Sequence, residues 1–190
     1  KNLNENIKFS RFENSFIWLK DAGVALPTFS VEAPTAPVVL SRHRNLFKLF
    51  QNDVGLLAAS YADGIQLRIL DDDPDINFGA IYENLVAQEL HCHGFELYYF
   101  NSKKLGEVDF VVEKSGFALP IEVKSGKAYQ RHNALSNIMA HQTYNIPEAY
   151  VLSGANLKVA GRIKYLPIYM LMFLVKEKPT DIVVKVDLPN

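Results

Sequence analysis

The chain has 190 residues, of which 48% are hydrophobic and 22% charged, a composition typical of one globular domain or a small pair of domains. The formal net charge of −1 argues against tight autonomous binding to DNA, because such binding usually requires a basic surface. A single cysteine excludes an intrachain disulfide and favours a reducing, cytoplasmic compartment. The longest apolar run, residues 166–175, is too short to span a bilayer, and no secretory signal is visible, so no membrane partner is expected.

The first part of the chain predicts two helices with an extended segment between them. Residues 11–22 carry apolar side chains at helical spacing, and residues 45–60 repeat that spacing. Residues 24–26 favour a short strand, and the prolines that follow indicate a loop or strand segment. This order predicts a small helical, winged-helix-like unit over residues 1–75, whose first ten residues are polar and are expected to be disordered.

Arg42, Arg44 and Lys48 form the one basic cluster of this part and support two interpretations. In one interpretation these residues contact nucleic acid. In the other they belong to a packing module that joins a further module to the C-terminal part of the chain, and we prefer this interpretation. The acidic, proline-containing run at residues 71–75 reads as a solvated linker and marks the domain boundary, so that the second unit covers residues 76–190.

Residues 76–93 predict a helix that ends at a glycine. Gly79, Glu83 and Ala87 share one face at intervals of four residues, and the small residues on either side of Glu83 let the helix approach a sheet closely. A surface glutamate is the ordinary alternative for Glu83. The run His91-Cys92-His93 places its side chains on divergent helix faces, so we expect ordinary helix-end residues and no zinc site.

A strand at residues 95–100 leads into a predicted β-hairpin at residues 107–124, with its turn between Ser115 and Gly116. Counting outward from the turn predicts an apolar face and a polar face. The apolar pairs are Val108–Val123, Phe110–Ile121 and Val112–Leu119, and the polar pairs are Asp109–Glu122 and Glu107–Lys124.

The polar face of this hairpin places Asp109 directly opposite Glu122, and like charges so placed are destabilising. A bound divalent cation would explain the pair, since hard oxygen ligands suit Mg²⁺ or Mn²⁺. Lys124 leaves the strand on the same face as Glu122. The alternative is a cross-strand ion pair between Glu107 and Lys124 on a solvated face, and these residues alone leave both interpretations open.

The rest of the chain predicts a helix at residues 131–145, a strand at 148–153, a short extended segment at 162–166 and an edge strand at 181–187. The whole pattern is that of an α/β protein. Gln142 or Lys127 are further candidates for assisting the site. No phosphate-binding loop of the Walker type occurs, so we expect no ATP hydrolysis by these residues alone.

Five segments in this order carry a resemblance to a known family. They are FKLFQNDVGLLAAS (47–60), GAIYENLVAQEL (79–90), EVDFVV (107–112), IEVKSG (121–126) and LPIYM (166–170). Together they resemble the uncharacterised domain that follows the ATPase module in many prokaryotic AAA-type ATPases, and the hairpin resembles the PD-(D/E)xK nuclease signature. The proline of that signature is absent, because Val108 precedes Asp109.

The resemblance implies a restriction-endonuclease-like mixed sheet flanked by helices, and metal-dependent phosphodiester hydrolysis of nucleic acid. Glu83, Asp109, Glu122 and the carbonyl of Val123 would hold Mg²⁺ or Mn²⁺, and Lys124 would orient the attacking water or stabilise charge. It also implies an N-terminal ATPase module as partner, and the lysine at position 1 leads us to expect a fragment. The alternatives are a catalytically silent DNA-binding or regulatory module of the ATPase, or an interaction domain.

Overall fold

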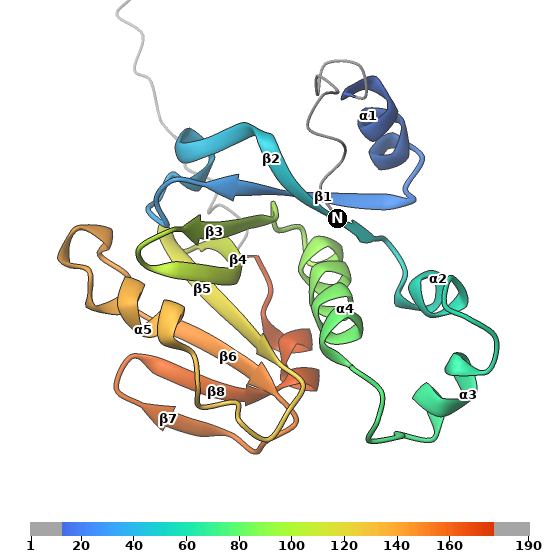
Figure 1. Cartoon of the computed structure of the whole chain (residues 1–190). Coiled ribbons are helices and arrows are strands. Elements are labelled where there is room, and N and C mark those ends of the chain that lie inside the picture. Colours follow the sequence, from blue (N-terminus) through green and yellow to red (C-terminus); the bar gives the residue numbers. More distant parts are fainter. Residues whose placement is uncertain (1–12, 177–190) are drawn as a thin grey trace, which may run out of the picture.

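The computed structural model describes residues 13–176, and its centre is a mixed eight-stranded sheet in the order β2-β1-β3-β4-β5-β6-β8-β7 (Figure 1). The strands are β1 (Ala25–Val31), β2 (Arg42–Gln51), β3 (Tyr98–Ser102), β4 (Gly106–Lys114), β5 (Phe117–Lys124), β6 (Ala149–Ser153), β7 (Lys158–Ala160) and β8 (Ile163–Pro167). The predicted α/β class is therefore confirmed. The predictions for residues 1–10 and 181–187 lie outside the described residues.

Two helices cover the two faces of this sheet. The α-helices are α1 (Glu13–Asp21), α2 (Val54–Ala59), α3 (Ile65–Leu70), α4 (Gly79–Cys92) and α5 (Asn133–Ala140), and the 3-10 helices are η2 (Val38–Ser41), η3 (Gln142–Tyr144) and η4 (Ile168–Phe173). Helix α4 contributes Val86 and Leu90 to one buried cluster, and α5 contributes Leu135 and Ile138 to another. Residues of β6 alternate between the two clusters, so both faces of the central sheet are buried.

The predicted hairpin register is confirmed for two of its pairs, Phe110 with Ile121 and Val112 with Leu119. The ladder ends at Phe110–Ile121, so the predicted pairs Val108–Val123, Asp109–Glu122 and Glu107–Lys124 lie beyond it. Ser115 and Gly116 both have positive φ angles, 49° and 79°, as a two-residue hairpin turn with matching twist requires. The alternative interpretation, a solvated polar face, does not hold. The hairpin lies in the middle of the sheet, and β5 is buried continuously from residue 118 to residue 123.

One residue of the predicted apolar face lies on the opposite side of the sheet. Phe110 packs in the cluster under α4, whereas Val108 packs with Val111 in the cluster under α5. The reason is an irregularity in the pairing of β3 with β4, where the register shifts between the pairs Tyr98–Val111 and Phe100–Val108. An extra residue of this kind interrupts the alternation of side chains, so Val108 is buried as predicted but does not line up with Phe110.

The predicted helix at residues 45–60 is wrong, because residues 42–51 form strand β2 and only 54–59 are helical. In β2, Phe47 contacts Phe29 of β1, whereas Phe50 contacts Phe110 of β4. β2 pairs with β1, and β1 pairs with β3, so both strands extend the sheet that contains the hairpin. The winged-helix-like description of this part does not match these strands, and the division of the chain at residue 75 stays a prediction.

Pro27 is compatible with strand β1 because of where it lies. The N–H of Phe29 points toward β3 and donates to the carbonyl of Leu97. Pro27 is two residues earlier, so its nitrogen faces the same side, before the pairing with β3 begins at Phe29. The missing N–H therefore removes no bond of the ladder.

A buried asparagine fixes the end of β2 to α4. The side chain of Asn84 is almost fully buried; its Oδ1 accepts from the N–H of Gln51 at 2.8 Å, and its Nδ2 donates to the Gln51 carbonyl at 3.0 Å. Both backbone groups of an edge-strand residue are thereby satisfied. The helix that carries Glu83 is in this way held against β2.

The remaining predicted elements are confirmed, the helices and β6 with shorter bounds and the strands β3 and β8 with bounds shifted toward the C-terminus. They are the helices at 11–22 (from Glu13, the first described residue), 76–93 and 131–145, and the strands at 95–100, 148–153 and 162–166. Helix α3 and strand β7 were not predicted, and the late apolar run forms the 3-10 helix η4. Both unpredicted elements are short, six and three residues, and carry little periodic signal.

Candidate metal and catalytic site

The candidate site lies at the end of the hairpin that is farthest from its turn. The β4–β5 ladder runs from Lys114–Phe117 to Phe110–Ile121. Beyond it, Oδ2 of Asp109 accepts the N–H of Val123 at 2.7 Å. If the ladder continued, a backbone carbonyl of β4 would accept this N–H. Here the carboxylate of Asp109 accepts it instead, and the pairing of the two strands ends.

Glu122 is buried, with 5% of its surface exposed, and forms an ion pair with Lys124, whose Nζ lies 2.6 Å from Oε1. Oε2 of the same carboxylate is also buried and has no hydrogen-bond partner. A buried carboxylate oxygen without a donor is costly. A cation at this atom would remove that cost, so Oε2 of Glu122 marks the position where the described structure most needs a ligand.

The three predicted acidic residues act on one another electrostatically. Burial and the nearby charge of Asp109 raise the pKa of Glu122 from 4.5 to about 7. Burial also raises the pKa of Asp109, against the opposing effect of the Val123 N–H. In Glu83, on α4, burial and then the charge of Asp109 raise the pKa of the carboxyl. The structure therefore brings Glu83, Asp109 and Glu122 into one electrostatic cluster.

The predicted ion pair between Glu107 and Lys124 is not the pairing found. Lys124 pairs with Glu122, and Oε1 of Glu107 pairs with Lys48 of β2 at 2.5 Å. Oε2 of Glu107 accepts from the amide of Asn101 at 2.8 Å. The sequence offers Lys48 only as a candidate for contact with nucleic acid and does not place it beside these acidic residues. Reading residues 45–60 as a helix placed it away from the sheet, and no local pattern links it to Glu107.

Both lysines of the cluster are held as cations. Burial alone would lower the pKa of Lys124, but the hydrogen bond to Glu122 and the nearby carboxylates raise it overall. Burial alone would also lower the pKa of Lys48. The hydrogen bond to Glu107 and the charges of Glu83 and Asp109 outweigh this effect, so the pKa of Lys48 is raised. At neutral pH neither lysine is a proton acceptor, which leaves positioning and charge stabilisation as their possible roles.

The donor set fits a hard divalent cation, because carboxylate oxygens are the ligands that Mg²⁺ and Mn²⁺ prefer. Within residues 13–176, no three His, Cys, Asp or Glu side chains are already placed to hold one ion. Lys124 bonds Oε1 of Glu122 and the Val123 N–H bonds Oδ2 of Asp109, whereas Oε2 of Glu122 is open to a cation. Joint coordination by these acidic residues requires side-chain movement.

The other candidates of the sequence lie apart from this cluster. Nδ1 of His93, at the end of α4, contacts the carbonyl oxygen of Leu174, which follows η4, at 2.7 Å. Gln142 and Lys127 are exposed, in η3 and in the loop after β5. The guanidinium of Arg42 lies over the Phe29 ring, 4.3 Å from its centroid, whereas Lys48 pairs with Glu107.

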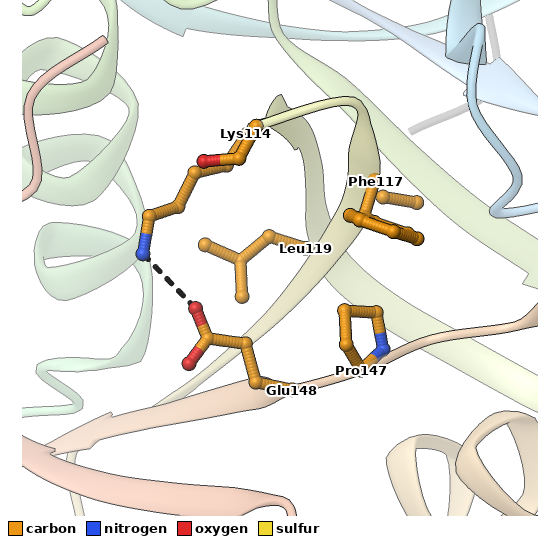
Figure 2. A pocket seen from close by; sticks show the side chains of 7 residues that line it. Lys114, Phe117, Leu119, Pro147 and Glu148 are labelled. Atoms are coloured by element: carbon orange, nitrogen blue, oxygen red, sulfur yellow. Dashed lines mark hydrogen bonds and ion pairs between the residues drawn. The ribbon is translucent and has the colours of Figure 1, made fainter. Parts of the chain in front are cut away.

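Two surface hollows lie near the turn end of the hairpin. Their volumes are about 310 and 360 Å³, and both are lined by Lys114. Figure 2 shows the first, with Leu119 and Pro147 around the ion pair of Lys114 with Glu148. None of the acidic residues of the candidate site lines either hollow.

The raised pKa of Glu122 predicts a stability that changes with pH in the absence of metal. The folded carboxyl holds its proton up to about pH 7 and the unfolded one only up to about 4.5, so this group destabilises the fold as pH rises between those values. Glu122→Gln should remove that loss, which is on the order of 3 kcal/mol. Urea unfolding in EDTA across this range measures it, with the exposed Glu96→Gln as control. Parallel pH profiles of Glu122→Gln and the unmodified protein would contradict the prediction.

The fold and the cluster together define a mixed α/β protein that carries acids and lysines at the open end of a central hairpin. Residues 78–171 match a family described as Domain of unknown function (DUF4143). This range includes Glu83, Asp109, Glu122 and Lys124 and leaves out β1 and β2. The predicted resemblance to an uncharacterised domain is thereby supported over this range.

No curated protein and no solved structure matches the chain. Across residues 13–176, every helix is too short or too polar to cross a membrane.

Proposed function

We propose that this chain is the nuclease-like C-terminal domain of an AAA-type ATPase, and that it hydrolyses phosphodiester bonds of nucleic acid with Mg²⁺ or Mn²⁺. The family similarity supports the association with an ATPase, because the resembling domain follows such a module. The arrangement supports the nuclease part. A helix with Glu83 packs against a hairpin with Asp109, Glu122 and Lys124, in a mixed sheet with helices on both faces. This is what a restriction-endonuclease-like fold implies.

The observation that carries the proposal is the buried, unpartnered Oε2 of Glu122 beside a second buried carboxylate. A folded protein without a ligand here bears the cost of two adjacent buried acids. Glu83, Asp109, Glu122 and the carbonyl of Val123 would hold the cation. When bound, the metal supplies a water of lowered pKa and neutralises charge on the phosphate.

The protein's own groups would have separate roles. The carboxylates of Asp109 and Glu122 fix the metal position, and the bond from Val123 N–H keeps Asp109 rigid at the end of the ladder. Lys124 bonds Oε1 of Glu122, the carboxylate whose other oxygen would hold the metal. Its ammonium would orient the attacking water or stabilise charge on the phosphoryl oxygens.

A catalytically silent module, which binds DNA or regulates the ATPase, is the second candidate. The bond from Lys124 to Oε1 of Glu122 favours it, because this cation already neutralises much of the site without a metal. In that case the cluster is a structural ion pair, and a nucleic acid would bind without being cut.

Metal-dependent cleavage by the unmodified protein tests the proposal. We expect nicking of labelled DNA or RNA in millimolar Mg²⁺ or Mn²⁺, none in EDTA, and none with Asp109→Ala, a variant that guards against a contaminating nuclease. The assay is repeated with the ATPase module added. Salt-dependent binding without cleavage would instead support the silent module, and neither binding nor cleavage would leave an interaction domain.

A further inference from the structure

Strand β2 places a second cation beside the candidate site. Nζ of Lys48 lies 2.5 Å from Oε1 of Glu107 and 5.0 Å from the centre of the Tyr99 ring. The lysine side chain is 28% exposed, so its stem is packed while part of it reaches solvent. Lys48 is thus a fixed ammonium at the rim of the acidic cluster.

Glu107, the partner of Lys48, is itself held by a hydrogen bond from a neighbouring strand. Glu107 uses both of its oxygens, one for Lys48 and one for the amide of Asn101 in the neighbouring strand β3. In β2, Lys48 pairs with Thr28 of β1, which fixes where along the sheet its side chain begins. An ammonium has three N–H donors, and the ion pair with Glu107 accounts for one of them.

The balance of charge in the acidic cluster suggests a role for Lys48. Four carboxyl groups, those of Glu83, Glu107, Asp109 and Glu122, stand with two ammonium groups, those of Lys48 and Lys124. When all four carboxyl groups are ionised, two carboxylate charges remain, which one divalent ion would neutralise. A phosphodiester that then arrives is an anion. It needs a donor at the rim that the carboxylates around the metal do not already occupy, and Lys48 meets this condition.

We propose that Lys48 binds a phosphate of the nucleic-acid strand next to the scissile bond, and that Glu107 is its partner while no substrate is bound. The inference rests on the proposed function. It makes the N-terminal strands β1 and β2 part of the substrate site, although the matched family range begins only at residue 78. Lys48 is a substrate-binding residue in this scheme, and the water-directing role stays with Lys124.

Two variants that break the same ion pair test this role. Lys48→Met removes the cation, whereas Glu107→Gln removes its partner and leaves the cation free. Fluorescence anisotropy of a labelled DNA oligonucleotide, in Ca²⁺ and at several salt concentrations, measures binding. We expect Lys48→Met to bind about tenfold more weakly at low salt, with the salt slope reduced by about one, because one phosphate contact is lost. Glu107→Gln is expected to bind as well as the unmodified protein or better.

Lys20→Met is the matched control, because Lys20 is an exposed lysine of helix α1 and its replacement removes the same charge. Single-turnover cleavage in Mn²⁺ adds a second readout, in which Lys48→Met should raise KM much more than it lowers kcat. Equal weakening by Lys48→Met and Glu107→Gln would mean a structural ion pair and overturn the inference, as would unchanged binding by Lys48→Met. If the unmodified protein binds no nucleic acid, the proposed function fails and this inference falls with it. Normal cleavage by Lys48→Met with unchanged KM would defeat the inference alone.

Discussion

Replacing Lys124 with alanine is expected to abolish metal-dependent cleavage while Mn²⁺ still binds. Removing a group that orients the water or stabilises the transition-state charge costs about 10²–10³-fold in rate. The carboxylates that would hold the metal remain in place, and Glu122 loses the ammonium that competes for Oε1. A single-turnover assay with saturating Mn²⁺ measures the loss, and the shift of the melting temperature by Mn²⁺ reports binding.

The same substitution should destabilise the metal-free protein, because it leaves the buried charge of Glu122 without a partner. Cleavage must therefore be assayed well below the melting temperature of the variant. Lys127→Ala, an exposed lysine in the loop that follows, is the matched control and should cleave normally. Full activity of Lys124→Ala would exclude Lys124 from the chemistry. Lost activity together with a lost Mn²⁺ shift would point to a disrupted site.

Mn²⁺ is expected to stabilise the unmodified protein strongly and Asp109→Asn hardly at all. A ligand at 100 times its Kd stabilises a folded protein by about 2.7 kcal/mol. The asparagine variant loses one of the charged ligands and with it most of this gain. Thermal melts of both proteins, each in EDTA and in millimolar Mn²⁺, measure the difference.

In EDTA the order of stability should reverse. Asp109→Asn keeps an oxygen that can accept the Val123 N–H and removes the repulsion with Glu122, so we expect a gain on the order of 0.5–1 kcal/mol. Asp109→Ala is the matched control, because it removes both the charge and the acceptor and should lack this gain. Two results together would contradict this prediction: Mn²⁺ does not change the melting temperature of the unmodified protein, and Asp109→Asn is less stable than the unmodified protein in EDTA. Asp109 would then be a structural hydrogen-bonding residue.

Much of the candidate site follows from local sequence. A two-residue turn at Ser115 and Gly116 and strict alternation on both sides leave one register for the hairpin, and that register sets Asp109 near Glu122. The helix with Glu83 follows from its spacing and its glycine end. These features depend on residues within a few positions of one another, which is why they can be read without the fold.

The edges of the site needed the tertiary structure. Residues 42–51 carry apolar side chains at a spacing that also suits a helix. They form a strand because they pair with β1. Strand preference depends on the neighbouring strands more than on the residues themselves. For that reason the chain alone did not place Lys48 beside Glu107, which lies in a strand far along the sequence.

The sequence by itself determined the hairpin, its turn, the helix before it and the acid and lysine residues at its open end. The fold decided that both faces of the hairpin are buried, that Val108 packs on the side opposite Phe110, and that Lys124 pairs with Glu122. Turn geometry and side-chain period act over a few residues. Burial and charge pairing depend on which distant strands and helices pack together, and it is burial that raises the pKa of Glu122 to about 7 and leaves one of its oxygens without a partner.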